Sequence, residues 1–177
     1  MKQVKFVTAE EAVKVVKSGD RVHMSSVAVT PHLLIHALVD RGRKGELRHV
    51  KIQHIHTEGA APYAAPEFEG IFQLESFFVG SNVRKQTQAG YADYIPVFLH
   101  ETQRLSREGY LKVNVAFIQV SPPDKHGFVS DTDNLGGNPI PDVQLLLFGH
   151  IGFKQVCETF TGIRIFLVTS GFVFMDG

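Results

Sequence analysis

Along residues 1–120, the spacing of apolar positions switches repeatedly between the period of a strand and that of a helix. Alternating apolar and polar positions, or a short continuous apolar run, indicate a strand. Strands are expected within residues 21–26, 47–57, 72–80 and 111–120, with a brief one at the start of 93–109. Helices are expected within residues 8–20, 29–42 and 81–90, and in the later part of 93–109.

Two of these helices carry recognisable start signals. Thr8 and Glu11 have the spacing of a capping box, and Gly19 followed by Asp20 is expected to end the first helix. In the second helix, Thr30 is expected to cap the N-terminus, with a proline in the first helical position. The apolar residues of the second helix share one face, which predicts an amphipathic helix packed on a sheet.

The alternation of strands and helices determines the expected fold class. Parallel strands need a crossover connection, which is usually a helix, so this order favours an open, mainly parallel α/β sheet. Right-handed crossovers then place helices on both faces of the sheet. One long connection, residues 58–70, is rich in Ala, Pro and Gly, and a connection of this length is usually functional or mobile.

The pattern changes after residue 130. Residues 131–177 contain Lys154 and Arg164 as their only fixed positive charges, and their apolar runs at 145–148 and 165–168 have no clear period. We therefore expect residues 1–130 to form a partial α/β domain and residues 131–177 to be a divergent tail of uncertain structure.

Composition narrows the possible partners. Eighteen basic residues balance eighteen acidic ones, which disfavours nucleic acid and anionic membranes as partners. The single cysteine, Cys157, excludes an intramolecular disulfide and a thiolate zinc cluster, and a reducing compartment is the simpler interpretation. The first residues do not resemble a secretory signal or a mitochondrial presequence. We expect a cytoplasmic protein, with a mitochondrial location as the alternative.

Histidine pairs raise the question of metal binding. His54 and His56 are two residues apart on a predicted strand, and His32 and His36 are four apart on a predicted helix, which are both spacings of metal ligands. No HExxH sequence or third ligand accompanies them. A structural role is favoured and no metal is expected, although a metal-dependent hydrolase remains an alternative.

Phosphate-binding and nucleophile motifs are mostly absent. The chain has no GxGxxG, P-loop or GxSxG sequence. A predicted strand runs into Gly80, and Ser81 and Asn82 then open a predicted helix beside Arg84. The free N–H groups of such a helix could hold an anion, or Ser81 or Asn82 could simply cap it.

The sequence VSPPDKHGFVS, residues 120–130, ends the most apolar predicted strand. Its two prolines stop the strand, Asp124 and Lys125 favour a turn, and Gly127 permits a positive φ. His126 then lies at the carboxyl end of a parallel strand, where open α/β sheets bind ligands. A rigid turn and the wall of a binding site are both open interpretations.

Three stretches together carry a family resemblance: VSPPDKHGFVS, residues 77–101, and residues 18–38. In residues 4–130 the chain resembles the acetyl-CoA hydrolase/transferase family, which includes acetate, butyrate and 4-hydroxybutyrate CoA-transferases. The resemblance implies α/β domains of the NagB/RpiA/CoA-transferase type, with a short-chain acyl-CoA and a carboxylic acid as substrates. It also implies ping-pong chemistry through a glutamyl-CoA thioester, and coenzyme A as the group that is carried.

The resemblance also implies roles for individual positions. Residues near the oxyanion and the substrate are expected at Val27, Ala28, Thr57 and Gly59. Residues that line the cleft near CoA are expected at Asn82, Arg84, Ser121, Asp124, His126 and Gly127.

The nucleophilic glutamate of the family and its Gly-rich CoA loop belong to a C-terminal half that this chain lacks, so no catalytic residue is assigned. Glu58 does not match the glutamate position and is interpreted as an exposed loop acid. We therefore interpret the chain as a truncated N-terminal domain of a CoA-transferase or acetyl-CoA hydrolase that is inactive alone. The alternative within the family is a non-catalytic subunit that acts with a C-terminal partner or as a homo-oligomer.

Overall fold

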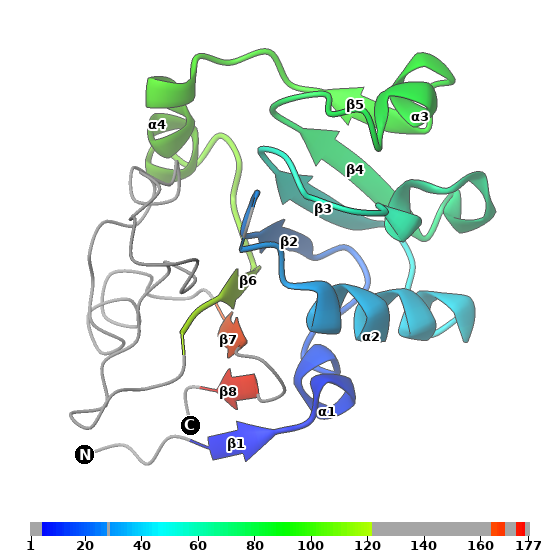
Figure 1. The fold of residues 1–177 in the computed structure, drawn as a ribbon, viewed down its shortest axis with the longest axis vertical. Helices are drawn as coiled ribbons and strands as arrows, with labels where there is room; N and C mark the ends of the chain where they lie inside the picture. The colour runs from blue at the N-terminus through cyan, green and yellow to red at the C-terminus, as the bar shows by residue number, and fades with distance from the viewer. Residues whose placement is uncertain (1–4, 28, 122–163, 169–172, 176–177) are drawn as a thin grey trace.

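A single twisted sheet runs through the molecule (Figure 1). The structure is a computed structural model that describes residues 5–27, 29–121, 164–168 and 173–175. Its strands are β1 (Lys5–Val7), β2 (Arg21–Met24), β3 (Val50–His54), β4 (Phe72–Ser76), β5 (Ala92–Tyr94), β6 (Val115–Gln119), β7 (Arg164–Val168) and β8 (Val173–Met175). Within the described ranges they form one sheet in the order β1-β8-β7-β6-β2-β3-β4-β5.

The strands from β7 to β5 all pair in parallel, whereas β8 pairs antiparallel with both β7 and β1. This confirms the expectation of an open, mainly parallel sheet. Because the pairs from β6 through β4 are parallel neighbours, the carboxyl ends of β6, β2, β3 and β4 meet at one edge. The loops that follow these strands are therefore neighbours in space although they are far apart in the sequence.

Short helices connect the strands. The helices are α1 (Ala9–Val13), α2 (His32–Arg43), α3 (Arg84–Gln88) and α4 (Thr102–Arg107), with 3-10 turns η1 (Pro62–Ala64), η2 (Pro66–Phe68) and η3 (Leu99–Glu101). Figure 1 shows α1 and α2 together near β1 and β2, and α4 apart from them, on the side toward which the arrows of β2 and β3 point. The coverage of both faces of the sheet stays a prediction.

The main core lies between the sheet and α2. Leu34 and Leu38 of α2 are fully buried in one hydrophobic cluster with Val22 of β2 and residues of β3 and β4. At the far end of α2 the helix approaches β4 so closely that a Cβ at Gly42 would lie 2.5 Å from the Phe72 ring. A side chain at this position would have to displace the Phe72 ring, so glycine permits the close approach of the helix to the sheet.

The first helix is shorter than its sequence pattern predicts. Thr8 caps α1 as expected, because its Oγ1 accepts a hydrogen bond from the Glu11 N–H at 3.2 Å. The helix ends at Val13 instead of continuing toward residue 19. After it, the N–H of Val16 donates to the carbonyl of Val13. The chain thus tightens into i to i+3 turns, and the apolar pattern continues without an α-helix.

The expected cap of α2 is wrong. The helix begins at His32, Pro31 occupies the N-cap position, and the Thr30 side chain makes no capping hydrogen bond. The Thr30 hydroxyl instead donates to the Val27 carbonyl at 2.7 Å, within the preceding loop. A local side-chain bond of this kind competes with capping, and here it has replaced the cap.

Two strands come from the part of the sequence that had no clear period. Residues 164–168 form β7, which pairs in parallel with β6, and β8 joins β7 to β1. Residues 165–168 are a continuous apolar run, so they lack the alternation by which strands are recognised. The division of the chain at residue 130 stays a prediction.

The irregular connection at residues 58–70 is ordered around η1 and η2, each of which starts with a proline. Tyr63, Ala64 and Phe68 of this connection are buried in the core. No helix in the described residues is both long and apolar enough to cross a bilayer.

Candidate functional site

The loops that follow β2 and β3 are joined at the carboxyl edge of the sheet. Val27, after β2, and Thr57, after β3, form an isolated parallel bridge. The Val27 N–H donates to the His56 carbonyl at 2.8 Å. Because open α/β sheets bind ligands outside the carboxyl ends of their strands, the structure brings these two predicted site residues together where a ligand is expected.

Val27 has an unusual backbone conformation. Its φ is +56°, in the left-handed region, and the other non-glycine residue there among the described residues is His49. A β-branched side chain makes this region costly, by about 1 to 3 kcal/mol, so surrounding contacts must hold it. Backbone strain of this kind clusters at ligand sites, which supports a functional role for the loop after β2.

Buried serine hydroxyls anchor the same loop on both sides. The Ser26 Oγ accepts from the Ile55 N–H at 3.3 Å, in the loop after β3. The Ser25 Oγ accepts from the Gln119 N–H at 3.0 Å, at the end of β6, and donates to the Val29 carbonyl. Both serines are buried, so the loop after β2 is tied to both neighbouring strands.

Asn82 fastens the loop after β4 to the same place. Its Nδ2 donates to the Thr57 carbonyl at 2.8 Å and to the Gly59 carbonyl at 3.0 Å. Gly59 itself has a φ of +75°. A Cβ at Gly80 would lie 2.7 Å from the His56 ring and 2.8 Å from the Asn82 amide oxygen, so a side chain there would have to displace these two side chains. The predicted residues Thr57, Gly59 and Asn82 therefore form one connected unit.

Arg84 lies apart from this unit. It is the first residue of α3 and is exposed to solvent. The N-cap of α3 is Val83, without a side-chain hydrogen bond, so neither Ser81 nor Asn82 caps the helix. The capping interpretation is therefore wrong, because the Asn82 amide is engaged by the carbonyls of the loop after β3.

A buried chain of hydroxyl and imidazole groups lies under the loop after β3. The hydroxyls of Thr57 and Tyr63 are 2.9 Å apart, and the Tyr63 hydroxyl lies 2.9 Å from His54 Nε2. Burial lowers the pKa of His54 to about 3 and raises the pKa of Tyr63. Both groups are thus neutral near pH 7. The Thr57 side chain points into this interior, so its backbone faces the neighbouring loops.

These contacts also answer the metal question. His54 Nε2 is engaged by Tyr63, and His56 lies 3.6 Å from a Glu58 carboxylate oxygen at the surface. His32 and His36 are both exposed on α2. In the described part of the chain, no three His, Cys, Asp or Glu side chains are grouped as metal ligands. The contacts therefore give the metal-dependent hydrolase no support.

Most of the remaining predicted site positions lie outside the part of the chain that the structure describes. Ser121, the last described residue after β6, lies at the same edge of the sheet and is half-buried. Ala28, Asp124, His126 and Gly127 lie outside the described residues. Their expected roles stay predictions.

Comparison with known families agrees with this geometry. The family model of the acetyl-CoA hydrolase/transferase N-terminal domain matches residues 2–140. The chain belongs to this family. The match confirms the resemblance inferred from the three sequence stretches, and it includes every loop at the carboxyl edge described above.

Curated proteins similar to this chain include CoA-transferases. The chain is 43% identical over 121 residues to the succinyl-CoA:acetate/propanoyl-CoA:succinate CoA transferase of Fasciola hepatica, covering 68% of this chain and 25% of that protein. It is 36% identical over 126 residues to the 4-hydroxybutyrate coenzyme A transferase of Clostridium kluyveri, covering 71% and 29%. The chain thus spans between a quarter and a third of the length of these relatives.

A solved structure shares the fold. RipA from Yersinia pestis superposes with a TM-score of 0.64 at 27% sequence identity, covering 71% of this chain and 31% of that chain. The superposition supports the assignment of the open α/β sheet to the N-terminal part of the CoA-transferase fold.

Sequence reasoning missed a network of charged side chains that joins β2, β3 and β4. Glu75 of β4 accepts hydrogen bonds from Arg21 Nε at 2.7 Å and from Lys51 Nζ at 2.8 Å. Burial alone raises the pKa of Glu75, but the hydrogen bonds from Arg21 and Lys51 outweigh it and lower the pKa overall. Strand alternation predicts that these side chains share a face. The register places Arg21 opposite Lys51 and Glu75 two residues beyond the partner of Lys51, so only the hydrogen bonds in the structure show that the three side chains meet.

A hollow of about 210 Å³ lies elsewhere in the acetyl-CoA hydrolase/transferase domain. It opens near the amino ends of β3, β4 and β5, between His49, Phe72 and Asp93. It is therefore at the opposite edge from the loops of Val27 and Thr57, and we do not assign the substrate to it.

Proposed function

We propose that this chain supplies one wall of the active site of a CoA-transferase that moves CoA from a short-chain acyl-CoA to a carboxylic acid. The observation that carries the proposal is the bridge between Val27 and Thr57, with Asn82 bonded to the same loop. It joins three loops of a family member at the edge of the sheet where ligands bind. The names of the relatives, which act on succinyl-CoA, acetate and 4-hydroxybutyrate, support this class of substrate.

The proposed chemistry needs a nucleophile from outside this chain. A glutamate carboxylate attacks the thioester carbonyl and expels CoA, which leaves a mixed anhydride. The CoA thiolate then attacks the glutamyl carbonyl of the anhydride, releases the first acid and forms a glutamyl-CoA thioester. An incoming carboxylate then attacks the glutamyl thioester carbonyl and expels the CoA thiolate. The thiolate attacks the acyl carbonyl of the new anhydride, which forms the new acyl-CoA and regenerates the glutamate carboxylate. A carboxylate is a weak nucleophile, so hydrogen-bond donors aimed at the developing oxyanion are required.

We assign different tasks to the two residues expected at the oxyanion. The Val27 N–H already donates to the His56 carbonyl, so in this proposal Val27 positions the loop instead of binding the oxyanion. The donor is then expected from the next residue, Ala28. Thr57 and Gly59 form the facing wall through their backbone, since the Thr57 hydroxyl is directed at Tyr63.

The CoA side of the cleft is proposed to lie beyond the loop of Asn82. Arg84 is exposed next to that loop and is available to an anionic group, such as a CoA phosphate. Ser121 ends β6 at the same edge. We propose that Asp124, His126 and Gly127 continue the wall from there.

We also propose that activity requires a partner. The two CoA-transferases from Fasciola hepatica and Clostridium kluyveri are three to four times as long as the segment that this chain matches. The match covers 25% of the first and 29% of the second. A segment that corresponds to the rest of these relatives, outside residues 1–177, would supply the nucleophile, as a C-terminal half or within a larger assembly that includes further copies of this chain. We propose a cytoplasmic location, with the mitochondrion as the alternative that cell fractionation would distinguish.

The test uses the purified chain alone and together with the C-terminal part of the Fasciola hepatica relative. Acetyl-CoA is incubated with succinate or propionate, and the acyl-CoA products are separated by liquid chromatography and mass spectrometry. We expect a new acyl-CoA only from the pair. Transfer by the chain alone would contradict the need for a partner. Release of free CoA without acceptor acid would indicate hydrolysis, and no reaction by a folded pair would overturn the proposal.

A further inference from the structure

Thr30 makes two hydrogen bonds that join different loops. Its hydroxyl donates to the Val27 carbonyl at 2.7 Å and accepts from the Glu58 N–H at 3.0 Å. Thr30 is 4% exposed, so water does not compete freely for either bond. A single hydroxyl thus bonds to the loop after β2 on one side and to the loop after β3 on the other.

The hydrogen bond from the Thr30 hydroxyl to the Val27 carbonyl holds Val27, the residue with the left-handed backbone. The Val27 carbonyl also accepts from the Thr30 N–H at 3.2 Å, and the Val27 N–H donates to the His56 carbonyl at 2.8 Å. Both polar backbone groups of Val27 are therefore held. A β-branched residue at a φ of +56° reverts to an extended conformation unless such contacts hold it.

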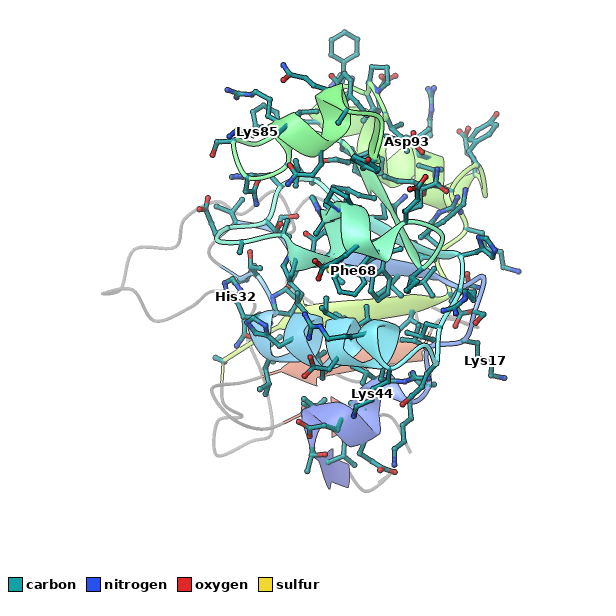
Figure 2. The ribbon with its side chains drawn as sticks, turned by 90° about the vertical axis from the view of Figure 1, so that its right-hand side faces the viewer. Lys17, His32, Lys44, Phe68, Lys85 and Asp93 are labelled. Carbon is teal, nitrogen blue, oxygen red and sulfur yellow. The ribbon has the colours of Figure 1, made fainter. Side chains whose placement is uncertain are left out.

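The hydrogen bond from the Glu58 N–H to the Thr30 hydroxyl holds the loop that follows β3. Glu58 lies between Thr57, which bridges to Val27, and Gly59, whose carbonyl is held by Asn82. The start of α2 closes the same corner. A Cβ at Gly59 would lie 3.2 Å from the His32 ring, and Figure 2 shows His32 at the beginning of that helix. The loop at residues 57–59 is thus bridged to Val27 and bonded to Asn82, and the Thr30 hydroxyl bonds to its central residue, Glu58.

We propose that Thr30 is a positioning residue of the CoA-transfer site, one that keeps the Val27 loop and the Glu58 loop at a fixed separation. The inference rests on the proposed function, because it assigns these loops to the substrate. Thr30 itself does not touch the substrate. Its hydroxyl is both donor and acceptor, and this is the property that the position requires.

The role of Thr30 predicts which kinetic constant changes. A residue that only holds loops in place leaves most ground-state binding intact, whereas transition-state stabilisation depends on the geometry of the loops. Loss of the hydroxyl is therefore expected to lower kcat with little change in KM for the acyl-CoA. A general loss of folded protein would instead lower the amount of active enzyme and leave the kcat of the folded fraction unchanged.

The test compares Thr30→Val, which keeps the shape and removes the hydroxyl, with Thr30→Ser, which keeps the hydroxyl. Amide hydrogen exchange is measured by NMR on the full chain. In Thr30→Val we expect the Glu58 amide to exchange about tenfold faster, whereas Thr30→Ser stays near the wild type. The Phe77 amide, which donates to the His54 carbonyl at 3.0 Å, is the internal control and is expected to change little.

Two further measurements accompany the exchange experiment. The three-bond HN–Hα coupling of Val27 is expected to shift toward the extended value in Thr30→Val only. In the pair with the C-terminal part, the kcat of Thr30→Val is expected to fall about tenfold and to be retained by Thr30→Ser.

The outcomes separate this inference from the proposed function. Equal acceleration at Glu58 and Phe77 would show a general loss of stability and overturn the positioning role, as would a Thr30→Ser variant that behaves like Thr30→Val. An unchanged kcat in Thr30→Val would also overturn it. If the wild-type pair shows no transfer, the proposed function fails, and the inferred role at a CoA-transfer site fails with it, while the exchange experiment still tests the bonds between the loops.

Discussion

The Tyr63 hydroxyl lies 2.9 Å from His54 Nε2, in the interior beneath the loop that follows β3. The two residues come from a 3-10 turn and a strand, and both are 1% exposed. A neutral imidazole nitrogen and a phenol can hydrogen-bond there without any charge, whereas Nδ1 of His54 is buried without a partner among the described residues. The pair supports the loop from below, because the same phenol oxygen also lies 2.9 Å from the Thr57 hydroxyl.

Tyr63→Phe is expected to lower the free energy of unfolding by about 1 to 3 kcal/mol, since it leaves two buried polar groups without a partner. The measurement is urea denaturation of the variant and the wild type. Tyr110→Phe is the matched control, because Tyr110 is 71% exposed, and it should unfold as the wild type does. Equal stability of Tyr63→Phe and the wild type would show that the hydroxyl contributes nothing.

Asn82→Asp is expected to weaken the connection between the loops after β4 and β3. The change replaces a donor with a carboxylate oxygen that faces the Thr57 and Gly59 carbonyls, and the repulsion should cost about 1 to 3 kcal/mol. Urea denaturation gives the stability, and the amide shifts of Gly59 report the loop. Gln88→Glu, at an exposed position of α3, adds the same charge as a control. If both variants lost stability equally, added negative charge would be the cause.

Glu75→Gln is expected to destabilise the chain by about 1 to 3 kcal/mol near pH 7, because Arg21 and Lys51 then lose the carboxylate that they meet at a part-buried position. The pKa of Glu75 is lowered in the folded chain, so the stabilisation is present above the ordinary value of 4.5 and is lost as the pH falls through the folded pKa. The difference between variant and wild type should therefore shrink in acid. Urea denaturation from pH 7 to pH 3 measures it.

The control for this network is Glu69→Gln, because Glu69 is exposed. We expect its stability to follow that of the wild type across the same pH range. A difference between Glu75→Gln and the wild type that stayed constant down to pH 3 would contradict a role for the ionised carboxylate.

Buried His54 is expected to make the fold sensitive to mild acid. Burial lowers its pKa from 6.5 to about 3, so below pH 6.5 the unfolded chain binds a proton that the folded chain does not. His54 by itself should thus lower stability by roughly 2 kcal/mol between pH 7 and pH 5. His23, whose pKa burial lowers to about 4, adds a loss in the same direction, so a His54→Gln variant isolates the contribution of His54. The NMR signal of the His54 ring should not titrate between pH 5 and pH 8. A titration midpoint near 6.5 would show that the ring is open to water.

Much of the fold was predictable from local patterns. The strands at β2, β3, β4 and β6 follow from apolar runs of the right length, and the start of α1 follows from Thr8. The cap of α2 was not predictable, because the Thr30 hydroxyl can bond either to an amide at the start of α2 or to the Val27 carbonyl. The sequence does not show which of these groups lies closer to it. Strand β7 was missed since residues 165–168 are a continuous apolar run without the alternation that identifies a strand.

The candidate site was only partly predictable. Thr57, Gly59 and Asn82 were identified by family resemblance, and the structure joins them by hydrogen bonds. Ser25 and Ser26 were not singled out, because a serine after a strand usually indicates an ordinary turn. The two serines have this role because β2 pairs with both β3 and β6, and only the structure shows that these strands are neighbours.

By itself, the sequence determined the α/β class, the positions of most elements and the family, because these depend on local periodicity and on short motifs. Only the tertiary structure decided which loops meet at the carboxyl edge, that Val27 adopts a left-handed backbone, and that Thr30 bonds to Val27 and Glu58. These features depend on strand order and register. Residues 27 and 57 are thirty positions apart in the sequence, and parallel pairing of β2 and β3 brings them together.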